Sequence, residues 1–436
     1  MKTTSTKGPS FFPANGAIIQ DRWPRLFDSL VTADEPVEIA YSSDAPQPTL
    51  VLNGIHLSSA YDQMAEAELQ ASLVPDGSRF AWIYGIGVGQ VPRVLLRRQG
   101  IESMVVVIMN RVVALQSFTY FDQRDWLSDP RLKLVFGGDQ EDINLPFAAI
   151  PSCLQLAGDE ASRIRDLVFL ELSTPFIQAA FRAKSGEMTQ RIKQNFSYIQ
   201  SDGDVAELFG TRIGETIAVA AAGPTLEYHY QWLRRNKTDL TLIAVDAALK
   251  PLLQAGIVPN IVVSIDAHRE GVLSLFEGID HETGRSMTLV YFPVVHKDVL
   301  QLWPGKRLTA YSDSPLYESF AGTNSNGTLF TSGSVTHSSI DLAVKMGALN
   351  VMLLGADFSF PGGKTHVSES PISREKPAAF SDHWVLNGYG KRVTTSPNLR
   401  WYLRDLETYI GRHKHVSFLN GSREGAHIEG TSYLEH

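Results

Sequence analysis

Short apolar runs that end in glycine or aspartate, each followed by a helical pattern, constrain the fold of this chain more than any other feature. The clearest series is TIAVAAAG (216–223), TLIAVD (241–246) and NIVVSID (260–266). Helical patterns at 225–235 and 247–256 separate these three runs. Strands and helices that alternate at this spacing predict a parallel sheet with helices on both faces.

A weaker form of the same alternation occurs in the first half of the chain. Apolar runs at 81–87, 103–109 and 132–137 predict three parallel strands with helices between them. Residues 1–75 are irregular, and we expect small strands and loops there, with one strand at 49–53.

The sequence therefore predicts an α/β protein with two Rossmann-like, doubly wound domains. The first domain covers residues 1–150, a helical connector covers 151–205, and a central catalytic domain covers 206–431. Further strands at 288–293, 350–355 and 415–419 and helices at 336–347 and 396–410 complete that domain, with a short helical closure at its C-terminal end. Residues 432–436 are expected to be a tail with the scar of an affinity tag.

Composition excludes several classes of protein. The chain has 436 residues and a net charge of −8 without a lysine or arginine run, so it lacks the electrostatic footprint of a nucleic-acid or membrane binder. The single cysteine, Cys153, excludes a disulfide framework and a CxxC zinc site. No apolar run approaches the ~18 residues of a membrane span, and no signal-peptide pattern opens the chain. We expect a cytoplasmic protein without an obligatory metal.

Gly85, Gly87 and Gly89 follow the first predicted strand of the 81–137 series. Glycines at this point let backbone N–H groups approach a phosphate or an adenosyl group. The next strand, however, ends in Met109-Asn110-Arg111, without the acidic residue that binds ribose in dinucleotide-binding domains. The motif therefore favours glycines needed for close packing, with ligand binding as the alternative.

A second turn, Gly223-Pro224-Thr225, ends the strand at 216–223. Pro224 fixes φ and Thr225 can cap the helix that follows, which would leave free N–H groups at the edge of the sheet. We predict that these groups approach a nucleotide; a turn without a ligand is the alternative.

Asp246 and Asp266 end the next two strands, and open α/β sheets bind ligands at the carboxyl ends of their strands. The two carboxylates could hold a ribose, orient a hydroxyl or bind Mg²⁺ through water, and Asp246 could instead cap a helix. His268 and Arg269 follow directly and add a titratable group and an anion-binding guanidinium.

Two later motifs complete the candidate site. Thr331-Ser332-Gly333-Ser334-Val335-Thr336 leads into the helix at 336–347, where its hydroxyls and N–H groups suit a phosphate. A helix cap alone is the alternative, but it accounts for one of these residues and not for six in a row. In LLGADFSFPGGKTHV (353–367), Asp357 ends a strand and the loop after it carries Lys364 and His366. A neutral histidine can act as a general base toward a hydroxyl.

Taken in order, these motifs resemble the motility accessory factor (Maf) family over about half of the chain, from about 210 to 431. The resemblance is carried by GPTL (223–226), AVDAALKPLLQAGIVPNIVVSID (244–266), SGSV (332–335), LLGADFSF…GGKTH (353–366) and NGSREGAHIEGT (420–431). It implies a glycosyltransferase that moves a nonulosonic acid from its CMP-activated form to serine or threonine hydroxyls of flagellin. The central domain of that family is similar to bacterial sialyltransferases.

The resemblance also implies roles for single residues. Those near the nucleotide are Gly223, Pro224, Thr225, Asp246, Ser332, Gly333 and Ser334. Those near the sugar and the acceptor are the catalytic candidates His366, Asp266 and Asp357 and the substrate candidates His268, Arg269 and Lys364. His366 is our preferred base, with Asp266 second, and Arg269 or Lys364 would pair with the carboxylate of the sugar.

Two departures and two alternatives accompany this resemblance. Chains of the family often continue into a helical C-terminal domain, and SGSV stands where a double glycine is more usual, so that Ser332 narrows the space for a nucleotide. A related archaeal domain resembles a pterin pyrophosphokinase, which would use ATP and put Mg²⁺ on Asp246 and Asp266. The other alternative is a non-catalytic accessory protein of motility or glycan assembly.

Overall fold

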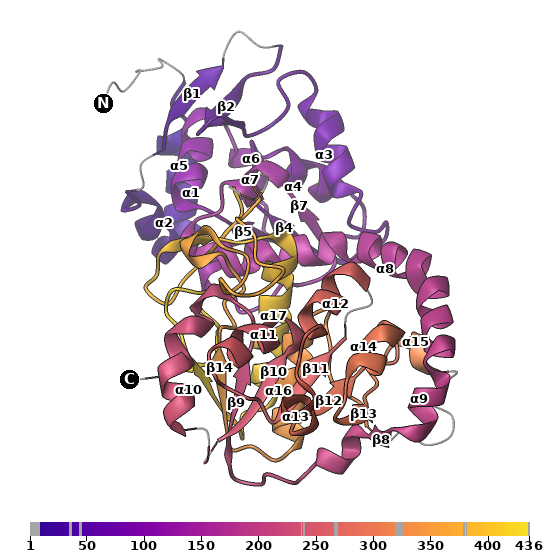
Figure 1. Ribbon diagram of the computed structural model, residues 1–436. Coiled ribbons are helices and arrows are strands. Elements are labelled where there is room, and N and C mark those ends of the chain that lie inside the picture. The colour runs from indigo at the N-terminus through magenta and orange to yellow at the C-terminus, as the bar shows by residue number, and fades with distance from the viewer. Residues whose placement is uncertain are drawn as a thin grey trace. The chain divides into compact units, whose positions relative to one another are not determined.

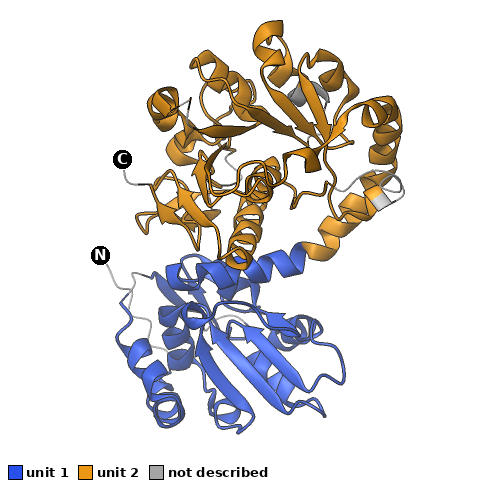
Figure 2. Cartoon of the chain, turned by 90° about the horizontal axis from the view of Figure 1, so that it is seen from below, with its two compact units in different colours: residues 1–173 blue, residues 174–436 orange. Residues whose placement is uncertain are grey.

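The computed structural model describes residues 9–34, 37–42, 46–236, 238, 240–265, 269–318, 327–377, 380 and 382–434. The chain divides into two compact units, residues 1–173 and 174–436 (Figure 2). The domain boundaries predicted near 150 and 205 fall on either side of this division. The long helix α8 (Ser162–Gln194) carries the chain from unit 1 into unit 2.

Unit 1 contains a four-stranded parallel sheet in the order β6-β5-β4-β7. Its strands are β4 (Phe80–Tyr84), β5 (Ser103–Ile108), β6 (Leu132–Phe136) and β7 (Phe147–Ala149). An antiparallel sheet precedes it, formed by β1 (Ile39–Ser42), β2 (Thr49–Leu52) and β3 (Ile55–His56). The helices are α1 (Phe12–Arg22), α2 (Pro24–Val31), α3 (Gln63–Ala71), α4 (Gln90–Leu96), α5 (Arg111–Tyr120), α6 (Arg124–Leu127) and α7 (Pro151–Gln155), with the 3₁₀ turns η1 (Gly137–Asp139) and η2 (Asp159–Ala161).

Both faces of this sheet are buried. Because side chains alternate along each strand, neighbouring residues point to opposite faces and belong to two different cores. Ile83 and Val106 belong to the core that includes residues of α3, α4, α5 and α6. Tyr84 and Val107 face the other way and pack with Ile164 near the start of α8. The predicted strands at 81–87, 103–109 and 132–137 are confirmed as β4, β5 and β6, and that at 49–53 as β2.

Residues 1–75 differ from the prediction, because three helices, α1 to α3, lie where strands and loops were expected. In the sequence, Pro13 and Gly16 suggest that no helix forms here. Pro13, however, lies in the first turn of α1, where the missing N–H has no partner to lose. Gly16 lies against the ring of Phe27, and a Cβ there would be 3.3 Å from it. Tertiary packing thus outweighs the local helix-breaking tendency of these residues.

Unit 2 is built on a nine-stranded sheet in the order β18-β17-β14-β9-β10-β11-β12-β13-β8. Figure 1 labels the strands of this sheet from β14 to β8. Every pairing in it is parallel. The strands are β8 (Gly203–Asp204), β9 (Thr216–Ala220), β10 (Thr241–Val245), β11 (Ile261–Ser264), β12 (Thr288–Tyr291), β13 (Lys306–Thr309), β14 (Asn350–Leu354), β17 (Ser417–Asn420) and β18 (Ser432–Tyr433). A separate hairpin is formed by β15 (Trp384–Leu386) and β16 (Arg392–Thr394).

Helices cover both faces of the larger sheet. On one face, side chains of α16 (Val335–Lys345) and α17 (Pro397–Arg412) pack against the strands. On the other, α10 (Tyr230–Asn236), α11 (Asp246–Gln254), α12 (Arg269–Phe276) and α14 (Lys297–Leu302) do so. The remaining helices are α9 (Phe196–Ser201), α13 (His281–Arg285) and α15 (Pro315–Glu318), with the 3₁₀ turns η3 (Val205–Leu208), η4 (Pro224–His229) and η5 (Pro361–Gly363). The predicted fold class, α/β with two parallel, helix-flanked sheets, is confirmed.

The order of the strands in unit 2 reverses beside β9. From β9 the chain builds β10, β11, β12 and β13 toward one edge, and it then returns to place β14 and β17 on the opposite side of β9. The connections after β9 and β14 therefore run to strands on opposite sides of this point, and open α/β sheets bind their ligands at such a switch point.

Among the described residues, no helix combines the length and the apolar character that crossing a membrane requires. The longest, α8, has 33 residues but carries charged side chains along its length.

We expect Gly85→Ala to destabilise unit 1 by about 3 kcal/mol. Gly85 has φ +102°, and a Cβ there would be 2.4 Å from the Cβ of Cys153. Gly77→Ala is the matched control, since Gly77 has φ +80° and no atom within 4 Å of the added methyl. It should cost about 1 kcal/mol, the backbone term alone. Urea unfolding of both variants measures the difference, and equal losses would contradict a packing role for Gly85.

Candidate functional site

Asp357 ties together the two loops at the switch point. The N–H of Thr225 donates to its Oδ2 at 2.9 Å, and the Thr225 hydroxyl donates to Oδ1 at 2.6 Å. Beside this pair, the N–H of Gly223 donates to the carbonyl oxygen of Gly355 at 2.9 Å. The end of β9 is thus joined to the end of β14 by side-chain and backbone bonds together.

A third loop, which follows β17, closes on the same carboxylate. The N–H of Ala426 donates to the Asp357 carbonyl oxygen at 2.7 Å. A Cβ on Gly425 would be 2.6 Å from Asp357 Oδ1, and one on Gly223 would be 2.4 Å from Oδ2. The carboxylate thus leaves no room for a Cβ at either position, and at Gly223 the Gly355 carbonyl oxygen, also at 2.4 Å, adds to the restriction.

Burial raises the pKa of Asp357 to about 6, although the hydrogen bonds from Thr225 act in the opposite direction. The nearby charge of Glu424 adds a smaller increase. The side chain is only 3% exposed. A buried carboxyl with such a pKa is typical of functional sites, because burying a charge is unfavourable for stability.

The residue after Asp357 has a strained backbone. Phe358 has φ +45°, a region that bulky residues rarely adopt. Its carbonyl oxygen accepts a hydrogen bond from the Thr395 hydroxyl at 2.7 Å, and its ring lies 6.4 Å from that of His337 in α16. Strain of this kind persists where the surroundings hold it, and it concentrates at functional sites.

The prediction that the Gly223-Pro224-Thr225 turn leaves N–H groups free is wrong. The N–H of Gly223 is bonded to Gly355, that of Thr225 is bonded to Asp357, and proline has none. The loops after β9 and β14 approach closely enough for these donors to be satisfied within the protein. Whether the turn contacts a nucleotide stays a prediction, but it cannot do so through these donors in this conformation.

His366 lies on a loop that crosses the carboxyl ends of β9 and β10. The N–H of Val367 donates to the Ala222 carbonyl oxygen at 2.9 Å, and the Ser370 hydroxyl donates to that of Ala247 at 3.1 Å. Burial lowers the pKa of His366 below its ordinary 6.5, and the charge of Arg374 lowers it further. His366 is thus a neutral, half-buried imidazole beside the switch point at neutral pH. Lys364, on the same loop, donates to the Ser368 hydroxyl at 2.8 Å.

Asp246 is the first residue of α11 and is 4% exposed. Its Oδ2 accepts from the Ser264 hydroxyl at 2.8 Å, which joins the ends of β10 and β11, and its Oδ1 accepts from the N–H of Ala247. The predicted Asp266 and His268, together with the side chain of Arg269, lie outside the described residues.

The oxygens of Asp246 and Ser264 are the kind that Mg²⁺ binds. Within the described part of the chain, no three His, Cys, Asp or Glu side chains are grouped to hold a metal ion.

Ser334 caps α16 and accepts from the N–H of Thr336 at 3.3 Å, which is the alternative role for this motif. Ser332 donates to Asp405 of α17, and burial raises the pKa of Asp405. Gly333 is exposed and has φ +82°, with the Tyr402 ring 3.0 Å from where a Cβ would lie. The C-terminal end of α16 lies beside the segment that precedes β9, since the N–H of Arg212 donates to the Met346 carbonyl oxygen. The N-terminus of α16 therefore lies toward the carboxyl ends of the strands.

Several residues of this edge were missed by sequence reasoning. They are Tyr228, Ser264, Asp405, Glu424 and Gly425. Tyr228 and Glu424 are exposed, and the Tyr228 hydroxyl donates to Glu424 at 2.9 Å. The glycine-rich motif at 420–430 was the available signal for the Glu424 loop, but no sequence pattern pairs Ser332 with Asp405.

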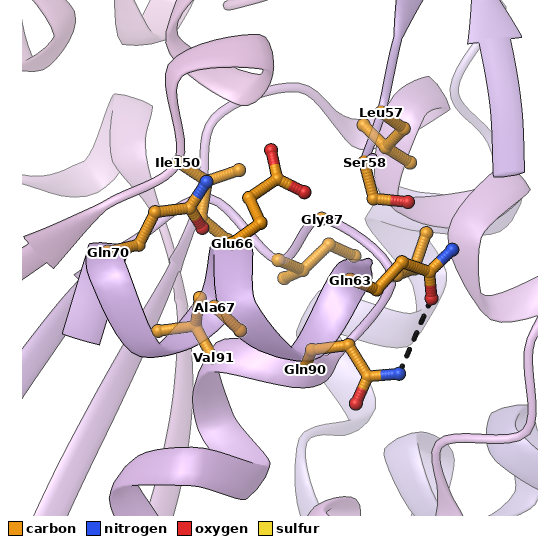
Figure 3. Close-up of a pocket in the computed structure, with 12 residues that line it drawn as sticks. Leu57, Ser58, Gln63, Glu66, Ala67, Gln70, Gly87, Gln90, Val91 and Ile150 are labelled. Atoms are coloured by element: carbon orange, nitrogen blue, oxygen red, sulfur yellow. Dashed lines mark hydrogen bonds between the residues drawn. The ribbon is translucent and has the colours of Figure 1, made fainter. Parts of the chain in front are cut away.

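Side chains of unit 1 occupy the space around the glycine-rich loop at 85–89, where a ligand would have to bind. The N–H of Gly87 donates to the Cys153 thiol at 3.3 Å, and a Cβ on Gly89 would be 2.7 Å from Trp126 Nε1. Figure 3 shows the small pocket beside Gly87, whose one charged lining residue is Glu66. The Gly87 N–H is already bonded to the Cys153 thiol, and the carboxylate of Glu66 lines the pocket, which disfavours a phosphate. This geometry favours the packing role predicted for these glycines.

Comparison with known proteins gives two likenesses. Residues 190–363 match the family model described as 6-hydroxymethylpterin diphosphokinase MptE-like. A solved structure, described as the MAf glycosyltransferase from Magnetospirillum magneticum AMB-1, is similar at 16% identity and a TM-score of 0.42, over 97% of this chain and 74% of that chain. A search of curated proteins returned no match. The two families that the motifs resemble, the Maf family and the pterin pyrophosphokinase-like domain, are thus also the ones to which the comparisons find this chain similar.

We expect Asp357→Asn to change how stability depends on pH. The carboxyl has a pKa of about 6 when folded against an ordinary 3.8, so the folded state binds the proton more tightly. The contribution of this carboxyl to the free energy of unfolding is fully present below about pH 4. It is lost as the pH rises from about 4 to above 6, and the total loss is about 3 kcal/mol. The free energy of unfolding of the variant minus that of the wild type should rise by this amount between pH 4 and pH 7.

Asp313→Asn, at an exposed aspartate of the same unit, is the control and should show no such rise. A difference between Asp357→Asn and wild type that stays constant with pH would contradict a carboxyl whose pKa is raised by burial.

Proposed function

We propose that unit 2 transfers a group from a nucleotide to a hydroxyl, and that it is a glycosyltransferase with a CMP-activated nonulosonic acid as donor. The acceptor would be a serine or threonine hydroxyl of a flagellin-like protein. The observation that carries the proposal is His366, a half-buried imidazole fixed beside the switch point through Val367 and Ala222. The motifs between about 210 and 431 that resemble the Maf family support the choice of donor and acceptor.

The nucleotide would lie along the carboxyl edge of the sheet. Ser334 and the N-terminal turn of α16 would take its phosphate, since the donors of the 223–225 turn are already used. Gly223 would offer a surface without a side chain, and Asp246 with Ser264 would face the ribose. Lys364, or Arg269, would pair with the carboxylate of the sugar.

The chemistry requires one base and one anion site. The acceptor oxygen bonds to the anomeric carbon while the bond from that carbon to the phosphate oxygen breaks, and CMP leaves with the electron pair. The proton of the acceptor hydroxyl passes to the imidazole of His366. Donors at the start of α16 would stabilise the charge that develops on the leaving phosphate.

A diphosphokinase is the second candidate, and the family-model match over residues 190–363 favours it. In that reaction a P–O bond of ATP breaks instead of a glycosidic bond, and a hydroxymethyl oxygen is the acceptor. Asp246, with Asp266, would then hold Mg²⁺, which would offset phosphate charge. The same edge of the sheet serves both reactions, so the nucleotide distinguishes them.

Thermal unfolding with different nucleotides tests the proposal. CMP at about 100 times its Kd should stabilise the chain by about 2.7 kcal/mol without metal, while ATP with Mg²⁺ should have no effect. Stabilisation only by ATP with Mg²⁺ would establish the second candidate. Binding of CMP with no release of CMP from a CMP-nonulosonate, with or without flagellin, would indicate a non-catalytic accessory protein.

His366→Ala should lower kcat about 100-fold and leave the Kd for CMP unchanged, because the base acts only on the acceptor. Since burial lowers the pKa of His366, the wild-type rate should rise with pH through a midpoint below 6.5 and then level off. His415→Ala is the control, at an exposed histidine before β17, and should leave the rate unchanged. A His366→Ala enzyme with the wild-type rate and pH profile would assign the base elsewhere.

A further inference from the structure

Asp357 lacks the geometry of a group that acts on substrate. Its side chain is 3% exposed, and both oxygens accept hydrogen bonds from one residue, Thr225, whose own side chain is fully buried. A general acid or base must reach the proton that it transfers. This carboxylate is instead directed at the first turn of η4, where it satisfies donors of the protein.

We propose that Asp357 is a positioning residue, which holds the Gly223–Thr225 turn in place and through it the edge of the sheet where the nucleotide binds. This inference rests on the proposed function and deepens it. It assigns Asp357 a different task from the catalytic one that the sequence predicted.

Three loops depend on this one carboxylate. The 223–225 turn is bonded to it directly, and the loop after β17 packs Gly425 against it, while Ala426 of that loop is bonded to the Asp357 backbone carbonyl oxygen. The third is the loop of His366, because Val367 is bonded to Ala222, the residue before the turn. A shift of the turn therefore moves both the nucleotide edge and the base.

The charge on Asp357 fits this task better than a neutral side chain of the same shape. A carboxylate accepts from both the N–H and the hydroxyl of Thr225 in charge-assisted bonds. An asparagine can accept from the N–H, but its NH₂ group must then donate to the hydroxyl oxygen, so the hydroxyl loses its acceptor and both bonds lose the charge.

The experiment measures the Kd for CMP by calorimetry in five variants of the full chain. They are Asp357→Asn, Thr225→Val, the double variant, Thr225→Ser and, as a matched control, Glu227→Gln at an exposed residue of η4. Asp357→Asn and Thr225→Val should each weaken binding about tenfold, and the double variant no further, because both remove the same interaction. Thr225→Ser keeps the hydroxyl and should recover most of the loss, and Glu227→Gln should bind as the wild type does.

The pH dependence gives a readout that a purely structural role would not move. Glu424 and Tyr228 are the other titratable groups that act on Asp357. The advantage of wild type over Asp357→Asn in CMP affinity should shrink as pH falls through about 6. The phosphate of CMP also titrates, with a pKa of about 6. Its titration affects binding to both proteins equally and therefore cancels in the comparison.

Hydrogen exchange of the peptide spanning 221–229, without ligand, separates this inference from the proposed function. Faster exchange in Asp357→Asn than in Glu227→Gln supports the positioning role, and equal exchange overturns it. Wild-type affinity with a collapsed kcat in Asp357→Asn also overturns it, since that is the signature of a catalytic group. If the wild type binds no CMP, the proposed function fails, and the exchange experiment still decides the role of Asp357.

Discussion

The reversal of strand order beside β9 is the constraint on which the rest of unit 2 depends. Because the chain builds outward from β9 in one direction and returns to place β14 on the other side, the ends of these two strands lie side by side at the carboxyl edge while their connections run to opposite sides of the sheet. Residues far apart in sequence meet there: Thr225 and Asp357 are 132 positions apart and share two hydrogen bonds. The position of His366 follows from the same reversal, since its loop follows β14 and is bonded back to Ala222 after β9.

The edge is held together at a cost in stability. Asp357 is buried with a raised pKa, and Phe358 beside it has an unfavourable φ. Gly223 and Gly425 are tied to the same carboxylate, because a Cβ at either would overlap its oxygens. Strain, a buried charge and obligatory glycines concentrate within a few residues here. That combination is characteristic of a site whose geometry serves binding more than stability.

The sequence predicts the sheets well and the contacts between their loops poorly. Runs such as TLIAVD mark buried strands because β-branched and apolar residues repeat without a polar face, and β10 and β11 are found where predicted. The helices in residues 1–75 were missed because Pro13 and Gly16 suggest that no helix forms, and the glycine is explained by the rings of Phe12 and Phe27 packed against it. The free N–H groups expected at Gly223 and Thr225 were wrong for a similar reason, since their acceptors lie on another strand. Local pattern identifies the carboxyl ends of strands, but not which donors remain available there.

A crystal structure of the full chain with CMP tests the central claim most directly, namely that the nucleotide binds at the switch point of unit 2. The account predicts the phosphate against Ser334 and the first turn of α16, the nucleoside beside Gly223, and the Asp357–Thr225 hydrogen bonds intact. CMP bound only in the pocket beside Gly87 of unit 1, or a phosphate that displaces Asp357 from Thr225, would contradict it.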